Sequence, residues 1–212
     1  MLFQFLPITP GLEIGALLIA LAVAIILHEV AHGYAALYLG DPTAKYAGRL
    51  TLNPLAHVDM WGTVFVPLLL IISQAGFVFG WAKPVPVNYF NLRGGKYGPV
   101  LVALAGPAMN LAITLVFGTL ARFAPDGTAL PYLFYIIAFV SAVLMFFNLI
   151  PIPPLDGSKV LYLFLDKQPE VKQFLERYSL WIFLAVIFLA QDLLASLVFI
   201  PAQRLIGLIT GF

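Results

Sequence analysis

The chain has 212 residues, of which 62% are hydrophobic and 10% are charged, and its mean hydropathy is +0.99. Soluble domains carry about 25% charged residues, so this composition excludes an ordinary soluble domain and indicates an integral membrane protein. The net charge of +1 gives no reason to expect a nucleic-acid partner, and the absence of cysteine excludes disulfides, thiolate metal sites and thiol nucleophiles.

The apolar residues gather into stretches of membrane-spanning length. The N-terminal MLFQFLPITP has no basic n-region and no small-residue cleavage site, so it is not interpreted as a signal peptide. Each stretch that follows is near the roughly 20 residues that cross a bilayer as a helix. They predict an all-α polytopic membrane protein forming a single integral membrane domain over residues 1–212. The stretches are 11–39, 61–81, 99–123, 131–150 and 178–200.

The first stretch carries the strongest chemical signal, the sequence HEVAH. His28 and His32 are spaced i, i+4, which puts both imidazoles on one face of a helix, where they can converge on one ion. Glu29 projects beside the pair and can take a proton from a water without binding the metal. This is the H-E-x-x-H arrangement of zinc peptidases. A chance spacing is the alternative, but ionisable groups in an apolar helix are unfavourable in lipid unless they are used.

The connections 41–60 and 80–98 are rich in Pro, Gly and Asn and contain short alternating or extended pieces. Irregular backbone is not viable when it is exposed to lipid, so these short extended segments are expected at the interface, in a re-entrant position or along a protein cavity. An ordinary solvent loop is the alternative for most of their length.

A catalytic zinc has three protein ligands, so a third ligand is needed from elsewhere in the chain. Asp156 is the best candidate, because three prolines at 151, 153 and 154 break the fourth apolar stretch just before it. An ordinary turn with Asp156 as a helix cap is the alternative. His57 is the rival ligand, or a gate near the metal, although a loop histidine is more often a satisfied or solvated side chain.

The fifth stretch contains two polar residues near its middle, Gln191 and Asp192. An ionisable residue at this depth is a candidate functional residue. No motif assigns either side chain a role, and an interhelical hydrogen bond facing the bundle is favoured.

Three motifs in order resemble the site-2 protease family of intramembrane zinc metalloproteases. They are HEVAH at 28–32, AGPAMN at 105–110 and NLIPIPPLDG at 148–157, and the likeness spans roughly residues 22–165. The chain is similar to a compact branch of that family without a PDZ domain and without an extra N-terminal span. The resemblance implies the family's helical bundle and intramembrane peptide hydrolysis.

The resemblance also assigns residues to roles. It implies one Zn²⁺ per chain held by His28, His32 and Asp156, with Glu29 as the general base. Asn148 would hydrogen-bond the substrate backbone or stabilise the oxyanion, and Asn110 would help to shape the cleft. The implied partners are the bilayer and transmembrane protein substrates that enter from lipid. An extended segment around 44–52 or 83–88 is expected to pair with the unwound substrate as an added strand.

The two metal-binding motifs must lie at the same depth in the membrane. If all stretches crossed fully, the histidines and Asp156 would lie at opposite faces, but a re-entrant second stretch, 61–81, brings them together. Basic residues then divide nine against two, which places the richer side in the cytoplasm. The N-terminus is then outside, and the active site lies toward the cytoplasmic side of a membrane that is expected to be a prokaryotic cell membrane.

Two other classes of function compete with the protease. A metal transporter or sensor would use polar ligands distributed along a path, whereas here they gather at one depth. An inactive protease-like scaffold would have no need for Glu29 beside the metal. Motif and membrane context together favour the protease.

Overall fold

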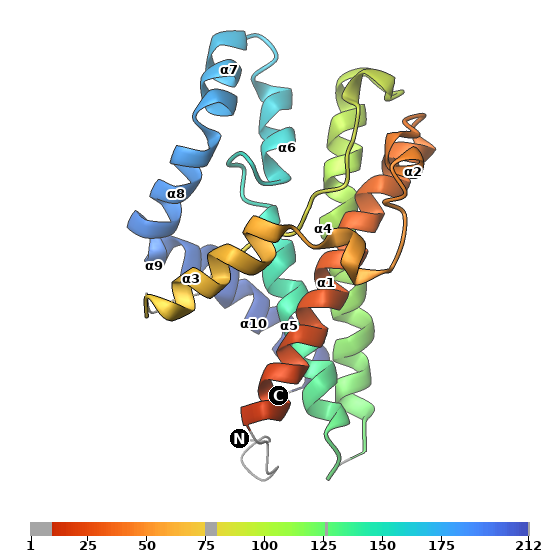
Figure 1. Ribbon diagram of the computed structural model, residues 1–212, viewed down its shortest axis with the longest axis vertical. Helices are drawn as coiled ribbons and strands as arrows, with labels where there is room; N and C mark the ends of the chain where they lie inside the picture. Colours follow the sequence, from red (N-terminus) through yellow and green to blue (C-terminus); the bar gives the residue numbers. More distant parts are fainter. Residues whose placement is uncertain (1–9, 75–79, 126, 212) are drawn as a thin grey trace.

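The structure, a computed structural model, describes residues 10–74, 80–125 and 127–211 (Figure 1). None of these residues lies in a β-strand, and the helices confirm the all-α class. The helices are α1 (Pro10–Tyr38), α2 (Thr43–Tyr46), α3 (Val66–Ile72), α4 (Gly98–Phe123), α5 (Leu130–Asn148), α6 (Gly157–Phe164), α7 (Pro169–Arg177), α8 (Ser179–Leu189), α9 (Gln191–Leu194) and α10 (Ile200–Thr210), with short 3₁₀ or π turns at Pro54–His57, Met60–Phe65, Tyr89–Asn91, Gly95–Tyr97 and Ala195–Phe199.

Several of these helices are long and apolar enough to cross a membrane, and the chain is therefore a multi-pass membrane protein. Within the described ranges, four stretches meet this criterion of length and composition: Glu13–Tyr38, Gly95–Phe123, Leu130–Asn148 and Asp192–Thr210. They include the first, third and fourth apolar stretches of the sequence.

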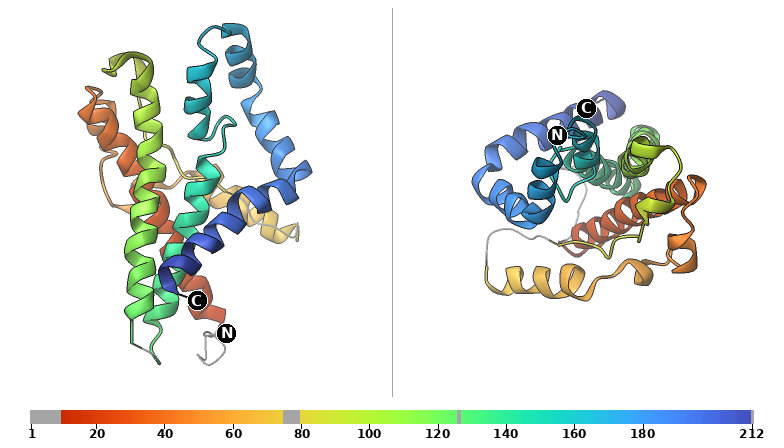
Figure 2. Two further views of the ribbon diagram at one scale, coloured as in Figure 1. Left: turned by 180° about the vertical axis from the view of Figure 1, so that it is seen from behind. Right: turned by 90° about the horizontal axis from the view of Figure 1, so that it is seen from above.

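Helices α1, α4 and α5 pack side by side and form the centre of the bundle (Figures 1 and 2). Helices α1 and α5 run in one direction, and α4 runs in the opposite direction between them in sequence. Ala16, Ala20 and Ala24 are buried at intervals of four residues along α1. Small side chains on one face let helix backbones approach closely, and in a membrane this close packing replaces the hydrophobic effect between helices.

The second apolar stretch turns back instead of crossing the bundle. Helix α3 lies across the long helices, and seen from above it forms a layer of its own (Figure 2). Residues 75–79 lie outside the described part of the chain. Beyond them, the N–H of Trp81 donates to the carbonyl of Gly62 at 3.1 Å, so the two ends of the stretch are neighbours.

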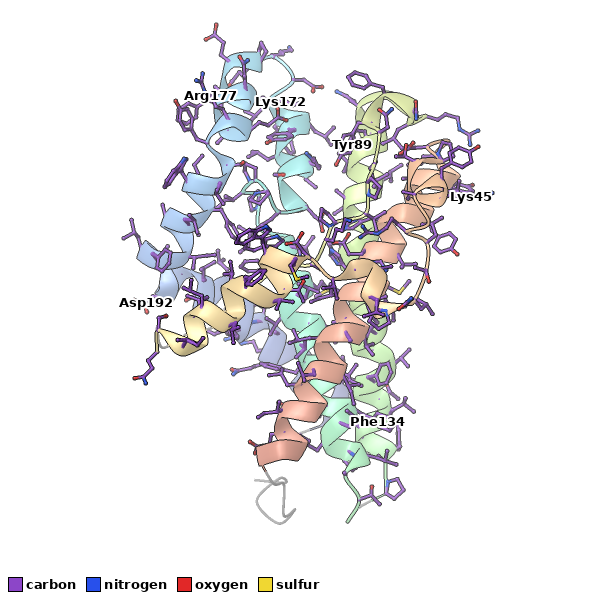
Figure 3. The ribbon with its side chains drawn as sticks, viewed as in Figure 1. Lys45, Tyr89, Phe134, Lys172, Arg177 and Asp192 are labelled. Carbon is purple, nitrogen blue, oxygen red and sulfur yellow. The ribbon has the colours of Figure 1, made fainter. Side chains whose placement is uncertain are left out.

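The fifth stretch differs from the single segment expected over 178–200. Helix α8 ends at Leu189, the next residue, Ala190, has a φ of −119° and a ψ of 38° that are not helical, and a second helical run then continues to Thr210. Asp192, expected to face the bundle, is exposed at this break and lies at the outer edge of the molecule (Figure 3). The side chain of Gln191 lies outside the described part of the structure. The break follows no Pro or Gly, so composition could not locate it.

Charge separates the two ends of the bundle. Lys45, Lys172 and Arg177 lie at one end, and Phe134 lies near the other (Figure 3). Arg122 is in the last turn of α4, where its guanidinium approaches the carbonyl of Ile209 at the end without these lysines. We call the lysine-bearing end the basic end.

A buried carboxylate ties α1 to the connection that crosses the site. Asp41 is fully buried just after α1 and accepts hydrogen bonds from Thr43, from the N–H of Asn88 at 2.7 Å and from the side chain of Asn91 at 3.0 Å. Burial raises the pKa of the Asp41 carboxyl, but these donors outweigh it, and the pKa lies below its ordinary value.

Replacing Asp41 with asparagine is expected to lower the stability at pH 7 by about 2 kcal/mol. One charged carboxylate oxygen becomes an amide NH2 group, and this group faces neighbours that are themselves hydrogen-bond donors. Since the folded-state pKa is lowered, this stabilisation is present above the ordinary carboxyl pKa of 3.8 and is lost as pH falls through the folded-state value. Thermal unfolding in detergent should therefore show the variant and wild type converging at acidic pH. Asp166→Asn, at an exposed ion pair with Lys96, is the control. Equal unfolding midpoints for Asp41→Asn and wild type at pH 7 would contradict this role.

Candidate metal centre

Helix α1 presents two imidazoles on one face, as the spacing in HEVAH predicts. The rings of His28 and His32 meet edge to face with centroids 4.5 Å apart, and their Nε2 atoms lie 3.0 Å from each other. His28 is buried inside the bundle. His28 lies ten residues and His32 six residues before Tyr38, the last residue of α1, which is about 15 Å and about 9 Å along the helix axis.

Asp156 reaches the same point from the other side of the bundle. Helix α5 ends at Asn148, and the prolines that follow keep the chain out of helix until α6 begins. Asp156 occupies the N-cap position of α6, yet its side chain makes no capping hydrogen bond. Its Oδ2 atom lies 3.2 Å from Nε2 of His28 and 3.3 Å from Nε2 of His32. A helix-cap role therefore does not account for this carboxylate.

The three facing atoms fit one tetrahedral metal ion. They form a triangle with edges of 3.0, 3.2 and 3.3 Å, and bonds of about 2.0 Å at the tetrahedral angle would separate ligand atoms by about 3.3 Å. Oδ2 of Asp156 is buried and receives no hydrogen bond, a costly state for a carboxylate oxygen unless a cation satisfies it. Across the described ranges, these three residues form the group of His, Asp or Glu side chains whose atoms converge within 4.8 Å.

The outer ring nitrogen of His32 is held so that its inner nitrogen keeps its lone pair, and His28 reaches the same state with one turn of the Asn110 side chain. Nδ1 of His32 lies 2.7 Å from the carbonyl of Val102, which only accepts, so Nδ1 carries the proton. Nδ1 of His28 lies 3.1 Å from the amide nitrogen of Asn110, whose Oδ1 is buried without a partner. A half-turn of that carboxamide would offer the oxygen to an Nδ1 proton of His28. Such contacts fix the tautomer of metal-binding histidines.

Asn110 thus lies behind His28 instead of along an open cleft. Asn110 is fully buried in α4. The hydroxyl of Thr114 donates to the main-chain carbonyl of Asn110 at 2.8 Å and contacts the carbonyl of Ala138 in α5 at 3.3 Å. The sequence motif AGPAMN singled out this residue, and the geometry gives it a positioning contact with a candidate ligand.

Gly106 is a functional position that the sequence reasoning did not identify. A Cβ atom on this residue would lie 2.5 Å from Cε1 of His28 and 2.5 Å from Nε2 of His32. Helix α4 can therefore approach both imidazoles only because this residue is glycine. The motif AGPAMN contains the residue, but no spacing rule links it to HEVAH.

Glu29 is held by the backbone of the connection that crosses the site. Its Oε2 accepts a hydrogen bond from the N–H of Val85 at 2.7 Å. Val85 lies between Pro84 and Pro86, which have no N–H. The connection is anchored before this contact, because the N–H of Lys83 donates to the carbonyl of His57 at 2.9 Å and Arg49 donates to the carbonyl of Lys83 at 2.6 Å.

His57 supports this connection and is not in the group of converging metal-binding atoms. Its ring is buried, and Nε2 donates to the carbonyl of Thr51 at 2.9 Å. A donating Nε2 carries a proton and is not available to a metal. Nδ1 of His57 keeps its lone pair, but the ring lies outside the group of atoms in which His28, His32 and Asp156 converge, and this favours Asp156 over His57 as the third ligand.

Asn148 is the last residue of α5, and its amide nitrogen donates to the carbonyl of Leu144 in its own helix at 3.0 Å. A carboxamide oxygen only accepts hydrogen bonds, so it cannot stabilise an oxyanion. The amide nitrogen carries two protons, so the one that is not donated to Leu144 remains available for a substrate carbonyl.

The known proteins to which the chain is similar are named as metalloproteases. The sequence model of peptidase family M50 matches residues 124–190, which include Asp156. The protein named "Putative zinc metalloprotease YwhC" of Bacillus subtilis (strain 168) is 40% identical over 155 residues, covering 68% of this chain and 67% of that protein. "Putative zinc metalloprotease Rip2" of Mycolicibacterium smegmatis is 31% identical over 188 residues, 86% of this chain and 70% of the relative. No solved structure matches the chain significantly.

Proposed function

Because this chain belongs to peptidase family M50, the site-2 proteases, and is a zinc metalloprotease of that type, we propose that it cleaves peptide bonds within the membrane. Its substrates would be the transmembrane segments of other proteins, which enter laterally from lipid. The observation that carries this proposal is the convergence of His28, His32 and Asp156 on one point inside a membrane-spanning helix bundle.

One Zn²⁺ per chain would be held by His28, His32 and Asp156. When bound, zinc supplies a Lewis acid that polarises a carbonyl and lowers the pKa of water to about 7. Glu29 acts as the general base: its carboxylate accepts the proton of the attacking water and later returns it to the leaving amine. The hydrogen bond from Val85 fixes Oε2 of Glu29, which leaves Oε1 available to accept the proton.

The connection around Val85 also suggests how an unwound substrate is held. The residues of the other proposed strand begin in α2 (Thr43–Tyr46), which makes 83–88 the better candidate for an added strand. Both backbone groups of Lys83 and the N–H of Val85 are engaged, and Pro84 and Pro86 lack an N–H. In this part of the segment, the main-chain groups that remain for a substrate are therefore carbonyl acceptors. The substrate must supply the N–H donors.

Methylation of substrate backbone nitrogens is the test of this pairing. A model transmembrane peptide N-methylated at single positions beside the cleavage site should be cut about tenfold more slowly at one or two positions, because a donor is lost. The same methyl group placed several residues away is the control. Equal cleavage rates for all the methylated peptides would contradict strand pairing.

The site faces the basic end of the bundle, which we assign to the cytoplasmic side of a prokaryotic cell membrane. Water would reach zinc from that side, while the substrate arrives from lipid. The alternative function of a metal transporter or sensor finds no support in the described residues, where one group of metal-binding side chains gathers at a single depth.

Metal content tests the ligand set. The purified wild-type protein is expected to contain about one zinc per chain. His28→Ala and Asp156→Ala should each lose most of it, whereas His57→Ala should keep it, because the His57 ring is engaged with Thr51. Elemental analysis after dialysis against a weak chelator measures all four proteins. If Asp156→Ala retains its zinc, the proposed ligand set is wrong.

A further inference from the structure

The basic end of the bundle contains a cavity that the proteolytic site does not use. Its volume is about 250 Å³, and it lies between the start of α4, helices α6 and α7, and Tyr89. We call it the basic pocket, and its polar lining includes Lys96, Lys159, Tyr162, Lys172, Asp166 and Glu176. Figure 3 shows Tyr89 and Lys172 on the facing elements at this end.

Two of the three lysines keep their charge available. Lys96 forms an ion pair with Asp166 at 3.1 Å, which neutralises both groups. Lys159 and Lys172 form no ion pair with any described residue. The Nζ atom of Lys159 lies 5.2 Å from the ring centroids of Tyr89 and Tyr162, and that of Lys172 lies 5.2 Å from the centroid of Tyr162. Glu176 is the one remaining carboxylate in the lining, so the pocket keeps a net positive charge.

Tyr162 gives an independent indication of a ligand site. Its side chain is 6% exposed, and its hydroxyl is buried without a hydrogen-bond partner. Buried hydroxyl groups nearly always have a partner. Burial, followed by the nearby Glu176, raises the pKa of Tyr162 to about 12, so the hydroxyl is protonated at neutral pH and can donate a hydrogen bond.

We propose that the basic pocket binds a phosphate group, with the ammonium groups of Lys159 and Lys172 and the hydroxyl of Tyr162 as its donors. A phosphate offers oxygens to all three donors at once, and its charge complements two ammonium groups. The ligand is either the headgroup of an anionic phospholipid or a soluble phosphate. This inference is independent of the proposed proteolysis, because none of the three donors is a metal ligand or the base.

The surroundings of the pocket favour a membrane ligand. Helix α7 forms one wall, and Val171 and Phe174 on that helix are exposed apolar residues close to Lys172 in the sequence. Exposed apolar and basic side chains on one short helix are typical of a helix at the lipid headgroup level. Basic pockets beside membrane helices bind lipid headgroups on the cytoplasmic side.

The pocket is also connected to the metal centre. The N–H of Lys159 donates to the carbonyl of Asp156 at 3.0 Å, so both residues belong to the same turn at the start of α6. A phosphate held by Lys159 and Lys172 would bridge α6 and α7 beside that turn.

The test measures phosphate binding by the full chain. In one arm, the protein is placed in nanodiscs of phosphatidylcholine with about 30% phosphatidylglycerol, and the lipid retained after transfer to detergent is counted by native mass spectrometry. In the other arm, titration calorimetry in detergent uses inorganic phosphate, with acetate at the same concentration for comparison. The variants are Tyr162→Phe, Lys159→Gln and Lys172→Gln. Lys167→Gln removes a nearby charge that does not line the pocket.

We expect about tenfold weaker retention of phosphatidylglycerol in each pocket variant and no change in Lys167→Gln. Binding of inorganic phosphate with the same pattern of variants identifies a soluble phosphate as the ligand. Tyr162→Phe keeps the ring and loses one donor, so circular dichroism should show an unchanged fold. The proposal is overturned if neither probe binds, if Lys167→Gln weakens binding as much as the pocket variants do, or if acetate binds as well as phosphate.

Discussion

Replacing Glu29 with glutamine is expected to lower the rate of peptide hydrolysis by about 10²–10⁴-fold while the zinc content stays near that of the wild type. Glutamine has the size of glutamate and keeps an oxygen that can accept the N–H of Val85, so the local packing persists. It cannot take a proton from water at neutral pH. The readout is cleavage of a transmembrane substrate reconstituted with the enzyme, together with metal analysis of the same preparation.

Glu13→Gln is the matched control for this experiment. Glu13 lies in the first turn of the same helix, at the end remote from the metal centre, and it is exposed. Its replacement should leave the cleavage rate within about twofold of the wild type. Full activity of Glu29→Gln would mean that another group is the base, and loss of zinc in that variant would mean that Glu29 acts on the metal site itself.

Replacing Gly106 with alanine is expected to reduce the affinity for zinc by about 100-fold and to abolish proteolysis. The new methyl group would lie 2.5 Å from atoms of both imidazoles, so at least one ring must move. The rings cannot move freely, because Val102 and Asn110 hold their outer nitrogens. Metal affinity is measured by competition with a chromogenic chelator.

Gly15→Ala separates this steric effect from the general effect of a methyl group on a helix. Gly15 lies in α1, and a Cβ atom there would meet nothing within 4 Å. Alanine is favoured over glycine inside a helix, so this variant should keep its zinc and be no less stable. If Gly106→Ala binds zinc as tightly as Gly15→Ala, helix α4 does not pack against the imidazoles as described.

The convergence of three side chains at the centre could be predicted because ionisable residue types are unfavourable in lipid unless they are used. Two histidines at i, i+4 identify one helix face without any knowledge of tertiary structure. Asp156 was predicted because prolines release the chain from helix just before it. The structure brings these three side chains together, and the resemblance to the site-2 proteases is confirmed by the family match.

The supporting contacts could not be predicted, since most of them involve backbone atoms. Every residue has a carbonyl and nearly every residue has an N–H, so nothing in the sequence distinguishes Val102 or Val85 as a partner. Gly106 is similar, because its importance lies in a side chain that is absent. The interruption of the helix at Ala190 was not predicted for a related reason: the sequence on both sides of it is apolar, and neither Pro nor Gly marks it.

The segment from Lys83 to Asn88 is fixed in place through its own main-chain atoms, while the side chains that hold it, Arg49, Asp41 and Glu29, come from elsewhere. The side chains of the segment are therefore not needed at several positions to hold it in place, and those of Lys83 and Pro84 are exposed. Substitutions of Lys83 can accumulate without moving the backbone, whereas Pro84 also fixes its own φ and lacks an N–H. With the proposed pairing of this segment and the substrate, such a separation would let substrate preference diverge in an evolving lineage while the catalytic framework stays constant.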